Sequence, residues 1–293
     1  MPMEKNIILR GIGGFYDVLT TDNQIVRCKL RGKLRLNNDR ILVGDWVEVK
    51  LLSETEGVIE AVLPRKNELI RPSIANIDQA VAVVAWSDPK PNWLFLDRLL
   101  VLIAAAGLEP IICFNKSDLA DAAPQTQEMI QVYRDIGYQV ISANTVYDHG
   151  IDELRQILTD KVSTFAGPSG VGKSSLLNRI ETGLELPVGS ISQKLKQGRH
   201  TTRQVELLRL SCGGLVADTP GFSQLSLAHI PAAELQRYFP EIWHNAQECR
   251  FNGCLHHREP GCAVTMRVKQ GEIVPLRYEN YLKLLAEIQQ RSD

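Results

Sequence analysis

The sequence contains no apolar run long enough to cross a membrane. Its longest apolar stretches, such as QAVAVVAW at 79–86, are far shorter than the roughly 20 residues that a membrane helix needs. The opening segment, MPMEKNIILR, lacks the apolar core and the cleavage site of a signal peptide. We therefore expect a cytoplasmic protein with no membrane partner.

A large net charge is also missing. The 33 lysines and arginines and the 34 aspartates and glutamates leave a formal net charge of −1. Such a chain has no overall attraction for nucleic acid, so any binding of this kind has to come from a local patch. Internal repeats and low-complexity tracts are absent, and 44% of the 293 residues are hydrophobic, which is enough for the cores of two or three domains.

Residues 1–70 contain short β-type runs separated by turn residues. The runs are NIILRGIGGFYDVLT, QIVRCKLRGKLRL, GDWVEVKLL and GVIEAVLP. Strands at this spacing predict a small barrel, and the five-stranded oligonucleotide-binding (OB) fold fits best.

Basic and apolar residues alternate in the second of these runs. Alternate side chains of a strand share one face, so the pattern predicts a basic face that would contact RNA phosphates. A solvated strand face is the alternative interpretation. The basic residues are Arg27, Lys29, Arg31, Lys33 and Arg35.

The pattern changes after the segment RPSIANIDQA, which begins at Arg71. Buried strands then alternate with amphipathic helices, which predicts an α/β domain with a parallel sheet. The C-terminal part holds a group of cysteines and histidines and ends in a helical run. We expect domains at 1–70, 71–228 and 229–293.

The segment GPSGVGKS at 167–174 fits the phosphate loop G-x-x-x-x-G-K-[ST]. An apolar strand precedes it and the helix SSLLNRI follows it, which is the context that the motif requires. Its backbone N–H groups would bind phosphate, with Lys173 neutralising charge. The predicted nucleotide-binding residues here are Gly167, Pro168, Ser169, Gly170, Val171, Gly172, Lys173, Ser174 and Ser175.

Two further motifs indicate that the base is guanine. Asp118 of NKSD offers two carboxylate oxygens that match the N1–H and exocyclic amino donors of guanine, whereas adenine would leave them unpaired. In a second motif, SAN at 142–144, the backbone N–H of Ala143 would read guanine O6. The predicted base-site residues are Asn115, Lys116, Ser117, Asp118, Ser142 and Ala143.

The segment DTPG at 218–221 supplies the remaining elements of a GTPase. Asp218 and the hydroxyl of Ser174 are the predicted Mg²⁺-site groups, and Gly221 would contact the γ-phosphate. The polar segment GRHTTRQ at 198–204 stands in the place of the first switch. Either Thr201 or Thr202 would complete the Mg²⁺ site, and the sequence leaves this choice open.

The order of these motifs is unusual, because both base motifs precede the phosphate loop. The same sheet can be built in this order if the two termini of the usual GTPase domain are joined and the chain is opened at another loop, because termini usually lie close together at the surface. The sequence therefore predicts a circularly permuted P-loop GTPase domain.

Near the C-terminus, three cysteines and two histidines lie within fourteen residues. Three thiolates and one imidazole suit one tetrahedral, structural Zn²⁺ per chain. Free cysteines with chance histidines are the alternative. The candidate ligands are Cys249, Cys254, Cys262 and either His256 or His257.

Over nearly the whole chain, the combination of these features resembles the RsgA family of circularly permuted GTPases. The features are the barrel, RPSIANIDQ, NKSD, GPSGVGKSSL, GRHTT, DTPGF and the Cys/His group. The resemblance implies an OB-fold and a zinc domain on either side of the GTPase domain, with His256 as the zinc ligand. It also implies binding to the 30S subunit and its 16S rRNA, and GTP hydrolysis stimulated by that subunit. A monomer is expected.

A glutamine that orients water follows DxxG in many GTPases, but Phe222 follows it here. Slow intrinsic hydrolysis is therefore expected. His200 is the nearest polar candidate for a catalytic group, and a solvated loop histidine is the alternative. The leading hypothesis is a GTP-hydrolysing factor for late 30S maturation, and the second is a GTP-regulated RNA-binding scaffold with incidental hydrolysis.

Overall fold

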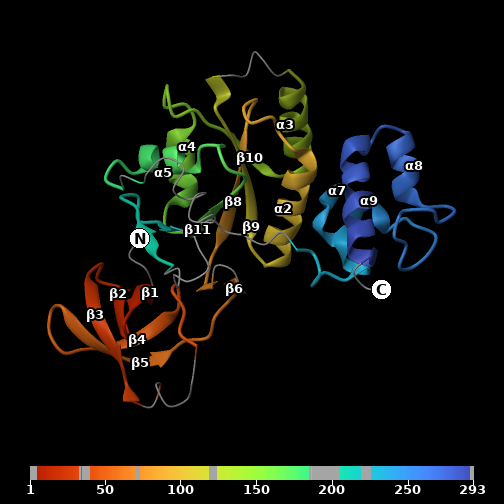
Figure 1. Cartoon of the computed structure of the whole chain (residues 1–293). Coiled ribbons are helices and arrows are strands. Elements are labelled where there is room, and N and C mark those ends of the chain that lie inside the picture. The colour runs from red at the N-terminus through yellow and green to blue at the C-terminus, as the bar shows by residue number, and fades with distance from the viewer. Residues whose placement is uncertain are drawn as a thin grey trace.

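The computed structural model describes residues 5–32, 34, 40–69, 73–118, 124–184, 186, 205–218 and 226–290. Figure 1 shows three parts along the chain: a β-barrel, a central sheet flanked by helices, and a helical C-terminal domain. None of the helices in these ranges has the length and apolar character that crossing a bilayer would require.

The N-terminal part is a closed barrel in the order β1-β2-β3-β5-β4, as the strand pattern predicts. Its strands are β1 (Asn6–Ile12), β2 (Phe15–Leu19), β3 (Ile25–Leu30), β4 (Trp46–Leu51) and β5 (Glu56–Val62). Strands β3 and β5 pair in parallel and close the barrel. Alternate residues of each strand point inward, and they form a separate apolar core of Ile8, Val18, Val26, Cys28, Val47 and Ile59.

The prediction of one continuous basic strand face is wrong beyond Leu30. Strand β3 ends there, and the Leu34 N–H donates to the Arg31 carbonyl at 3.0 Å, so the chain turns instead of continuing. Arg27 and Lys29 are exposed on one face of β3, as alternation requires. Arg31 pairs with Glu60 at 3.3 Å, which offsets part of the positive charge. Lys33 and Arg35 lie outside the described residues.

A small hairpin connects the barrel to the central sheet. It consists of β6 (Glu68–Leu69) and β7 (Ile74–Ala75). Ile74 and Ile77 are fully buried, and the amide of Asn76 donates to the Gly44 carbonyl of the barrel at 2.9 Å. The segment that the sequence suggests is a linker is therefore packed against both domains.

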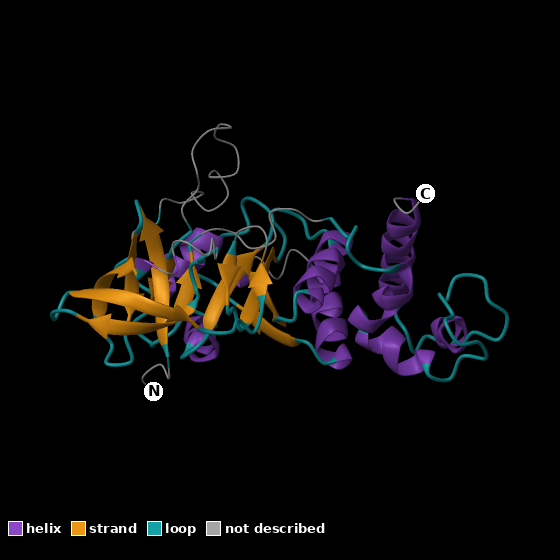
Figure 2. Ribbon diagram, turned by 90° about the horizontal axis from the view of Figure 1, so that it is seen from below, coloured by secondary structure: helices purple, strands orange, loops and turns teal. Residues whose placement is uncertain are grey.

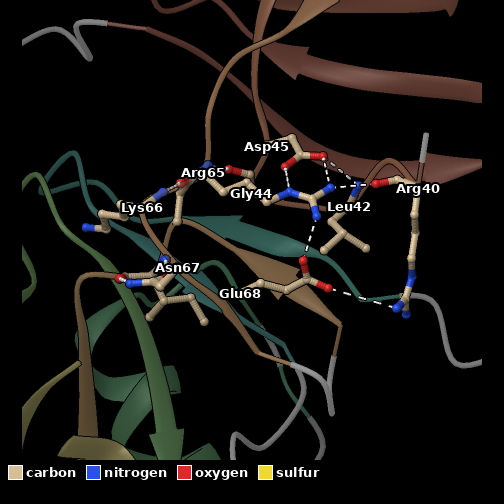
Figure 3. A network of polar contacts seen from close by, with 10 residues as sticks. Arg40, Leu42, Gly44, Asp45, Arg65, Lys66, Asn67 and Glu68 are labelled. Carbon is tan, nitrogen blue, oxygen red and sulfur yellow. Dashed lines mark hydrogen bonds and ion pairs between the residues drawn. The ribbon is translucent and has the colours of Figure 1, made fainter. Parts of the chain in front are cut away.

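Charged side chains strengthen this barrel junction (Figure 3). The Arg65 guanidinium donates to both carboxylate oxygens of Asp45, at 2.6 and 2.9 Å, and to Glu68 at 2.6 Å. Asp45 is fully buried and also accepts the Leu42 N–H, whereas Arg65 is one-quarter exposed. Arg40 lies at the solvent side, 3.9 Å from Glu68.

The central domain is a six-stranded sheet in the order β10-β9-β8-β11-β13-β12. Its strands are β8 (Gln79–Ala85), β9 (Glu109–Asn115), β10 (Gln139–Ser142), β11 (Val162–Ala166), β12 (Leu207–Arg209) and β13 (Leu215–Ala217). The first five of this order are parallel, as predicted. Strand β12 is antiparallel to β13, because the tight turn between them, with Gly213 at φ 89°, makes a hairpin.

Helices cover both faces of this sheet. They are α2 (Trp93–Ala105), α3 (Pro124–Ile136), α4 (Ile151–Leu158) and α5 (Lys173–Ile180). Alternate residues of β8 divide between two cores: Ala80, Ala82 and Val84 pack with α2 and α3, whereas Val81, Val83 and Ala85 pack with α4 and α5. This alternation explains why β8 is buried along its whole length.

The C-terminal domain is helical, as Figure 2 shows, and it packs beside α2 (Figure 1). It contains the 3₁₀ helix η2 (Ala232–Tyr238) and the helices α7 (Pro240–Ala246), α8 (Ala263–Lys269) and α9 (Pro275–Gln290). Its apolar core includes Val101 and Leu102 of α2, so the core extends into the central domain.

A buried ion pair crosses this C-terminal junction. Arg277 of α9 is 1% exposed, and its guanidinium contacts the fully buried Asp97 of α2. The same carboxylate accepts the hydroxyl of Tyr133 at 2.6 Å and the amide of Asn280 at 2.7 Å. Arg277 also donates to both oxygens of Glu241, at 2.7 and 3.1 Å, so every buried polar group of this cluster has a partner.

Candidate functional site

The predicted nucleotide motifs meet at one edge of the sheet. Strands β9, β10, β11 and β13 run parallel, and each of the four motifs begins at or just after the end of one of them. The carboxyl edge of an open parallel sheet is where such folds bind ligands. The permuted order of the motifs along the chain therefore does not separate them in space.

Glycine is required at two positions of the phosphate loop. Gly167 has φ 144°, and a Cβ there would lie 2.3 Å from the Val83 carbonyl oxygen. Gly172 has φ 92°, and its Cβ would lie 2.3 Å from Nδ2 of Asn115. The loop is thus packed against β8 on one side and against the NKSD motif on the other.

Lys173 lies under this loop, only 4% exposed. Its ammonium donates to the carbonyls of Gly167 and Pro168, at 2.8 and 2.7 Å. Burial lowers the pKa of Lys173 to about 8. Because an anion would offset the cost of burying this charge, the environment of Lys173 fits a phosphate ligand.

Asn115 connects the base motif to the phosphate loop. Its Nδ2 donates to the Val171 carbonyl at 2.8 Å, and the residue is 1% exposed. Its Oδ1 is buried and has no hydrogen-bond partner among the described residues. A buried acceptor without a donor is costly, so this atom fits a ligand that supplies an N–H.

The rest of NKSD lies at the surface. Lys116 adopts the left-handed conformation, with φ 62°, and its ammonium donates to the Asp88 carbonyl at 2.5 Å. Asp118 is exposed. The Ser117 N–H donates to the Ala143 carbonyl at 3.0 Å, which holds the two base motifs together.

The N–H of Ala143 donates to the Phe114 carbonyl at 2.8 Å. This bond extends the parallel ladder between β10 and β9, whose last pair is Ser142 with Phe114. Contact between this N–H and guanine O6 would require the bond to be shared or broken, so the role of Ala143 stays a prediction.

Two of the predicted Mg²⁺-site groups are described. Ser174 is buried in the first turn of α5, and Asp218 follows β13, the strand next to β11. Asp218 accepts the Glu206 N–H at 3.0 Å, which fixes its carboxylate at the sheet edge. Hydroxyl and carboxylate oxygens suit Mg²⁺. His200, Thr201, Thr202, Gly221 and Phe222 lie outside the described residues.

The Cys/His group forms a compact cluster. One ligand atom from each of four side chains lies within 4.8 Å of all the others, and these are Cys249, Cys254, His256 and Cys262. The His256 Nδ1 is 3.5 Å from the sulfur of Cys249 and 3.4 Å from that of Cys262. Three sulfurs and one imidazole around a common centre are compatible with structural zinc.

Residues outside the cluster orient its ligands. The Nε2 of His256 lies 2.9 Å from Oε1 of Gln236, which leaves Nδ1 to face the sulfurs. Glu259 accepts the N–H groups of Leu255, His257 and Arg258. Burial alone would raise the pKa of Glu259, but these bonds lower it to about 2. Spacing gave no sign of Gln236, because it lies twenty residues before His256.

An aromatic residue of the neighbouring strand, which the charge pattern did not indicate, lies beside the basic residues of β3. The ring of Phe15, on β2, has the guanidinium of Arg27 4.9 Å and the ammonium of Lys29 5.0 Å from its centroid. Phe15 is paired with Lys29 across the two strands, so the pairing register accounts for the contact.

Comparison with known proteins agrees with this geometry. A model described as RsgA GTPase matches residues 62–228, and one described as RsgA N-terminal domain matches residues 5–59. The Small ribosomal subunit biogenesis GTPase RsgA of Carboxydothermus hydrogenoformans is 49% identical over 285 residues, which cover 97% of both chains. That of Caldanaerobacter subterraneus is 48% identical, over 97% of this chain and 95% of the relative.

Two solved structures share the whole architecture. YjeQ from Thermotoga maritima superposes with a TM-score of 0.86 at 39% identity, covering 97% of this chain and 98% of its own. YloQ, described as a circularly permuted GTPase, gives a TM-score of 0.83 at 40% identity, covering 99% and 96%. With the family model matching more than half of its length, this chain belongs to the RsgA GTPase family.

Proposed function

We propose that this protein binds GTP with Mg²⁺ and hydrolyses it as a factor for late maturation of the 30S ribosomal subunit. The observation that carries the proposal is the contact of Asn115 with the phosphate loop, at 2.8 Å from Val171. It joins a base-reading motif to a phosphate-binding one, which is what a guanine nucleotide needs. The relatives, which are small ribosomal subunit biogenesis GTPases, indicate the process.

In this proposal the base is selected at the ends of β9 and β10. Asp118 accepts the N1–H and exocyclic amino group of guanine, while Asn115, Lys116 and Ser117 hold the loop. The phosphates bind the backbone of residues 167–175 and the ammonium of Lys173. Ser174, Asp218 and Thr201 or Thr202 would hold Mg²⁺, which neutralises charge on the phosphate oxygens. Gly221 contacts the γ-phosphate.

His200 is the proposed catalytic residue. Phe222 cannot align water, so the imidazole of His200 would orient the attacking molecule when the subunit is bound. Slow turnover by the free protein is the expected consequence. The alternative is a GTP-regulated RNA-binding scaffold, for which the absence of a glutamine after DTPG is the supporting observation.

The outer domains supply the contacts to the particle. Arg27 and Lys29 on β3, with Arg31, Lys33 and Arg35 after it, are the proposed contacts to 16S rRNA phosphates. Phe15, whose ring lies within about 5 Å of two of these cations, offers a surface for stacking a base. One structural Zn²⁺ on Cys249, Cys254, His256 and Cys262 would hold the C-terminal domain.

We further propose that the protein acts in the cytoplasm as a monomer, with domains at 1–70, 71–228 and 229–293. The separate barrel core and the apolar core of the C-terminal domain support this division.

The test is GTP turnover by the purified protein, alone and with increasing amounts of 30S subunits, with 50S subunits as the control. We expect strong stimulation by 30S subunits only, and no turnover of ATP. His200→Ala should lower the stimulated rate by about 100-fold, the usual contribution of a positioned acid or base, with GTP affinity nearly unchanged.

Tight GTP binding without stimulation would favour the scaffold. Equal losses of turnover and affinity in His200→Ala would remove the catalytic role of this histidine.

A further inference from the structure

A groove of about 990 Å³ lies where the C-terminal domain meets α3. The last turns of α3, helix α7 and the turn at 271–274 form its walls. The groove is remote in sequence from every nucleotide motif. Beside it, Arg277 of α9 contacts both Asp97 of α2 and Glu241 of α7.

Carboxylates outnumber cations around this groove. Of the charged residues that line it, Asp135, Glu241 and Glu272 are acidic and Arg237 is basic. The two arginines behind the walls do not neutralise this negative charge, because each of them contacts two carboxylates. Arg277 contacts both Glu241 and Asp97.

The second arginine behind the walls, Arg267, is shared in the same way between Glu272 and Glu248. Asp135 accepts a hydrogen bond from a neutral group, the amide of Gln131, at 2.7 Å. The groove therefore favours a cation and opposes a phosphate.

An exposed aromatic ring adds a second feature that suits a cation. Trp243 of α7 lines the groove and is 40% exposed, which is unusual for a side chain of this size. The guanidinium of Arg237 already lies 5.6 Å from the centroid of its ring. Val132, Ile136 and Val274 provide apolar surface beside it, against which the aliphatic stem of a lysine or arginine can pack.

We propose that this groove binds an extended basic segment of a protein partner, with arginine or lysine side chains between Trp243 and the carboxylates of Asp135 and Glu272. RNA is excluded by the same carboxylates, so the groove and the basic face of β3 would contact different components of a partner. The proposal does not depend on the chemistry at the nucleotide site.

The test uses the full-length protein and a short fluorescein-labelled peptide of alternating arginine and leucine, followed by fluorescence anisotropy. We expect saturable binding that weakens as salt is added, and no binding of a matched glutamate–leucine peptide. Asp135→Lys combined with Glu272→Lys should weaken binding by about tenfold, since two exposed ion pairs are lost.

The control is Asp22→Lys combined with Glu54→Lys, which changes the net charge equally but on exposed residues of the barrel. Its affinity for the peptide should equal that of the wild type. Trp243→Ala should also weaken binding, and Trp243→Phe should largely preserve it because the ring is retained. Unchanged GTP turnover in every variant would verify that the protein is folded.

The proposal would be overturned if the basic peptide did not bind, or if the wild type and the Asp135/Glu272 variant bound it equally. It would also be overturned if a short single-stranded RNA displaced the peptide from the wild type but did not displace it from the variant. The last result would assign the groove to RNA.

Discussion

The two outer domains are attached to the central sheet by contacts of different kinds. At the C-terminal junction, Arg277 and Asp97 are almost completely excluded from solvent. At the barrel junction, Arg65 is one-quarter exposed and Arg40 is mostly exposed, although Asp45 is buried. Because solvent and salt weaken exposed pairs far more than buried ones, the charged contacts at the C-terminal junction should be less sensitive to salt than those at the barrel junction.

The comparison also shows what each junction would lose on mutation. A buried pair gives little net stability when intact, because desolvation offsets its attraction, but it is costly to break on one side only. Breaking a half-exposed pair lowers the free energy of unfolding only slightly, because water replaces the missing partner. Mutations at the two junctions should therefore lower the free energy of unfolding by different amounts.

The largest effect should come from the Cys/His cluster of the C-terminal domain, which we propose binds zinc. Cys254→Ser should remove most of the binding free energy of zinc, on the order of 10 kcal/mol, which for such sites is folding free energy. Hydrogen exchange should then show loss of protection in residues 226–290, while GTP affinity stays nearly constant. His257→Ala is the matched control and should retain zinc, since His257 is exposed.

Arg277→Ala should have the next largest effect. It leaves Asp97 buried without its cation and should lower the free energy of unfolding by about 3–5 kcal/mol, measured by urea denaturation. Burial already raises the pKa of Asp97 against the pull of Arg277, so the carboxyl of the variant should take up a proton. Replacing both, as Asp97→Leu with Arg277→Met, should recover part of the loss. No recovery would mean that the other contacts of the pair, those of Asp97 with Tyr133 and Asn280 and of Arg277 with Glu241, outweigh the pair itself.

Arg65→Ala should cost less, about 2–3 kcal/mol, because Asp45 keeps the N–H of Leu42 as a donor. Arg40→Ala is the control, since this side chain is 63% exposed and its contact with Glu68 is long, at 3.9 Å. Thermal unfolding of the barrel measures both. Equal shifts of the unfolding temperature in the two variants would show that the burial of Asp45 does not increase the cost of losing its partner.

The smallest effect is expected from Arg10→Ala. Arg10 contacts Asp17 at 2.6 Å and reaches Glu206 of the central domain at 3.6 Å, but it is 45% exposed. The loss should be at most about 0.5 kcal/mol and should vanish at high salt. A change above about 1 kcal/mol in urea denaturation would contradict the view that exposed pairs contribute little to the barrel junction.

Much of the fold could be predicted because its signals are local. The alternation of residues along the barrel strands and the strand–helix alternation of the central domain are set by neighbours in the chain. The nucleotide motifs and the Cys/His group are short, and their spacing reflects the ligand that each would bind. The circular permutation follows from motif order alone.

Other features could not be predicted because their partners are distant in sequence. Arg277 and Asp97 are 180 residues apart, and neither position is marked as buried by its own segment. The contact between the Gln236 side chain and His256 could not be predicted for the same reason, since the two residues are twenty positions apart. The end of β3 at Leu30 could not be predicted either, because alternation of residues says nothing about where a strand ends.

The strand order of the central sheet gives it a mechanical property. The barrel connects to the first residue of β8, the C-terminal domain follows the last residue of β13, and β11 lies between them, hydrogen-bonded to both. A pull between the outer domains would load these parallel ladders in shear, so that their hydrogen bonds resist together and not one after another. The strand that carries the phosphate loop thus lies on the path by which tension passes from one end of the molecule to the other.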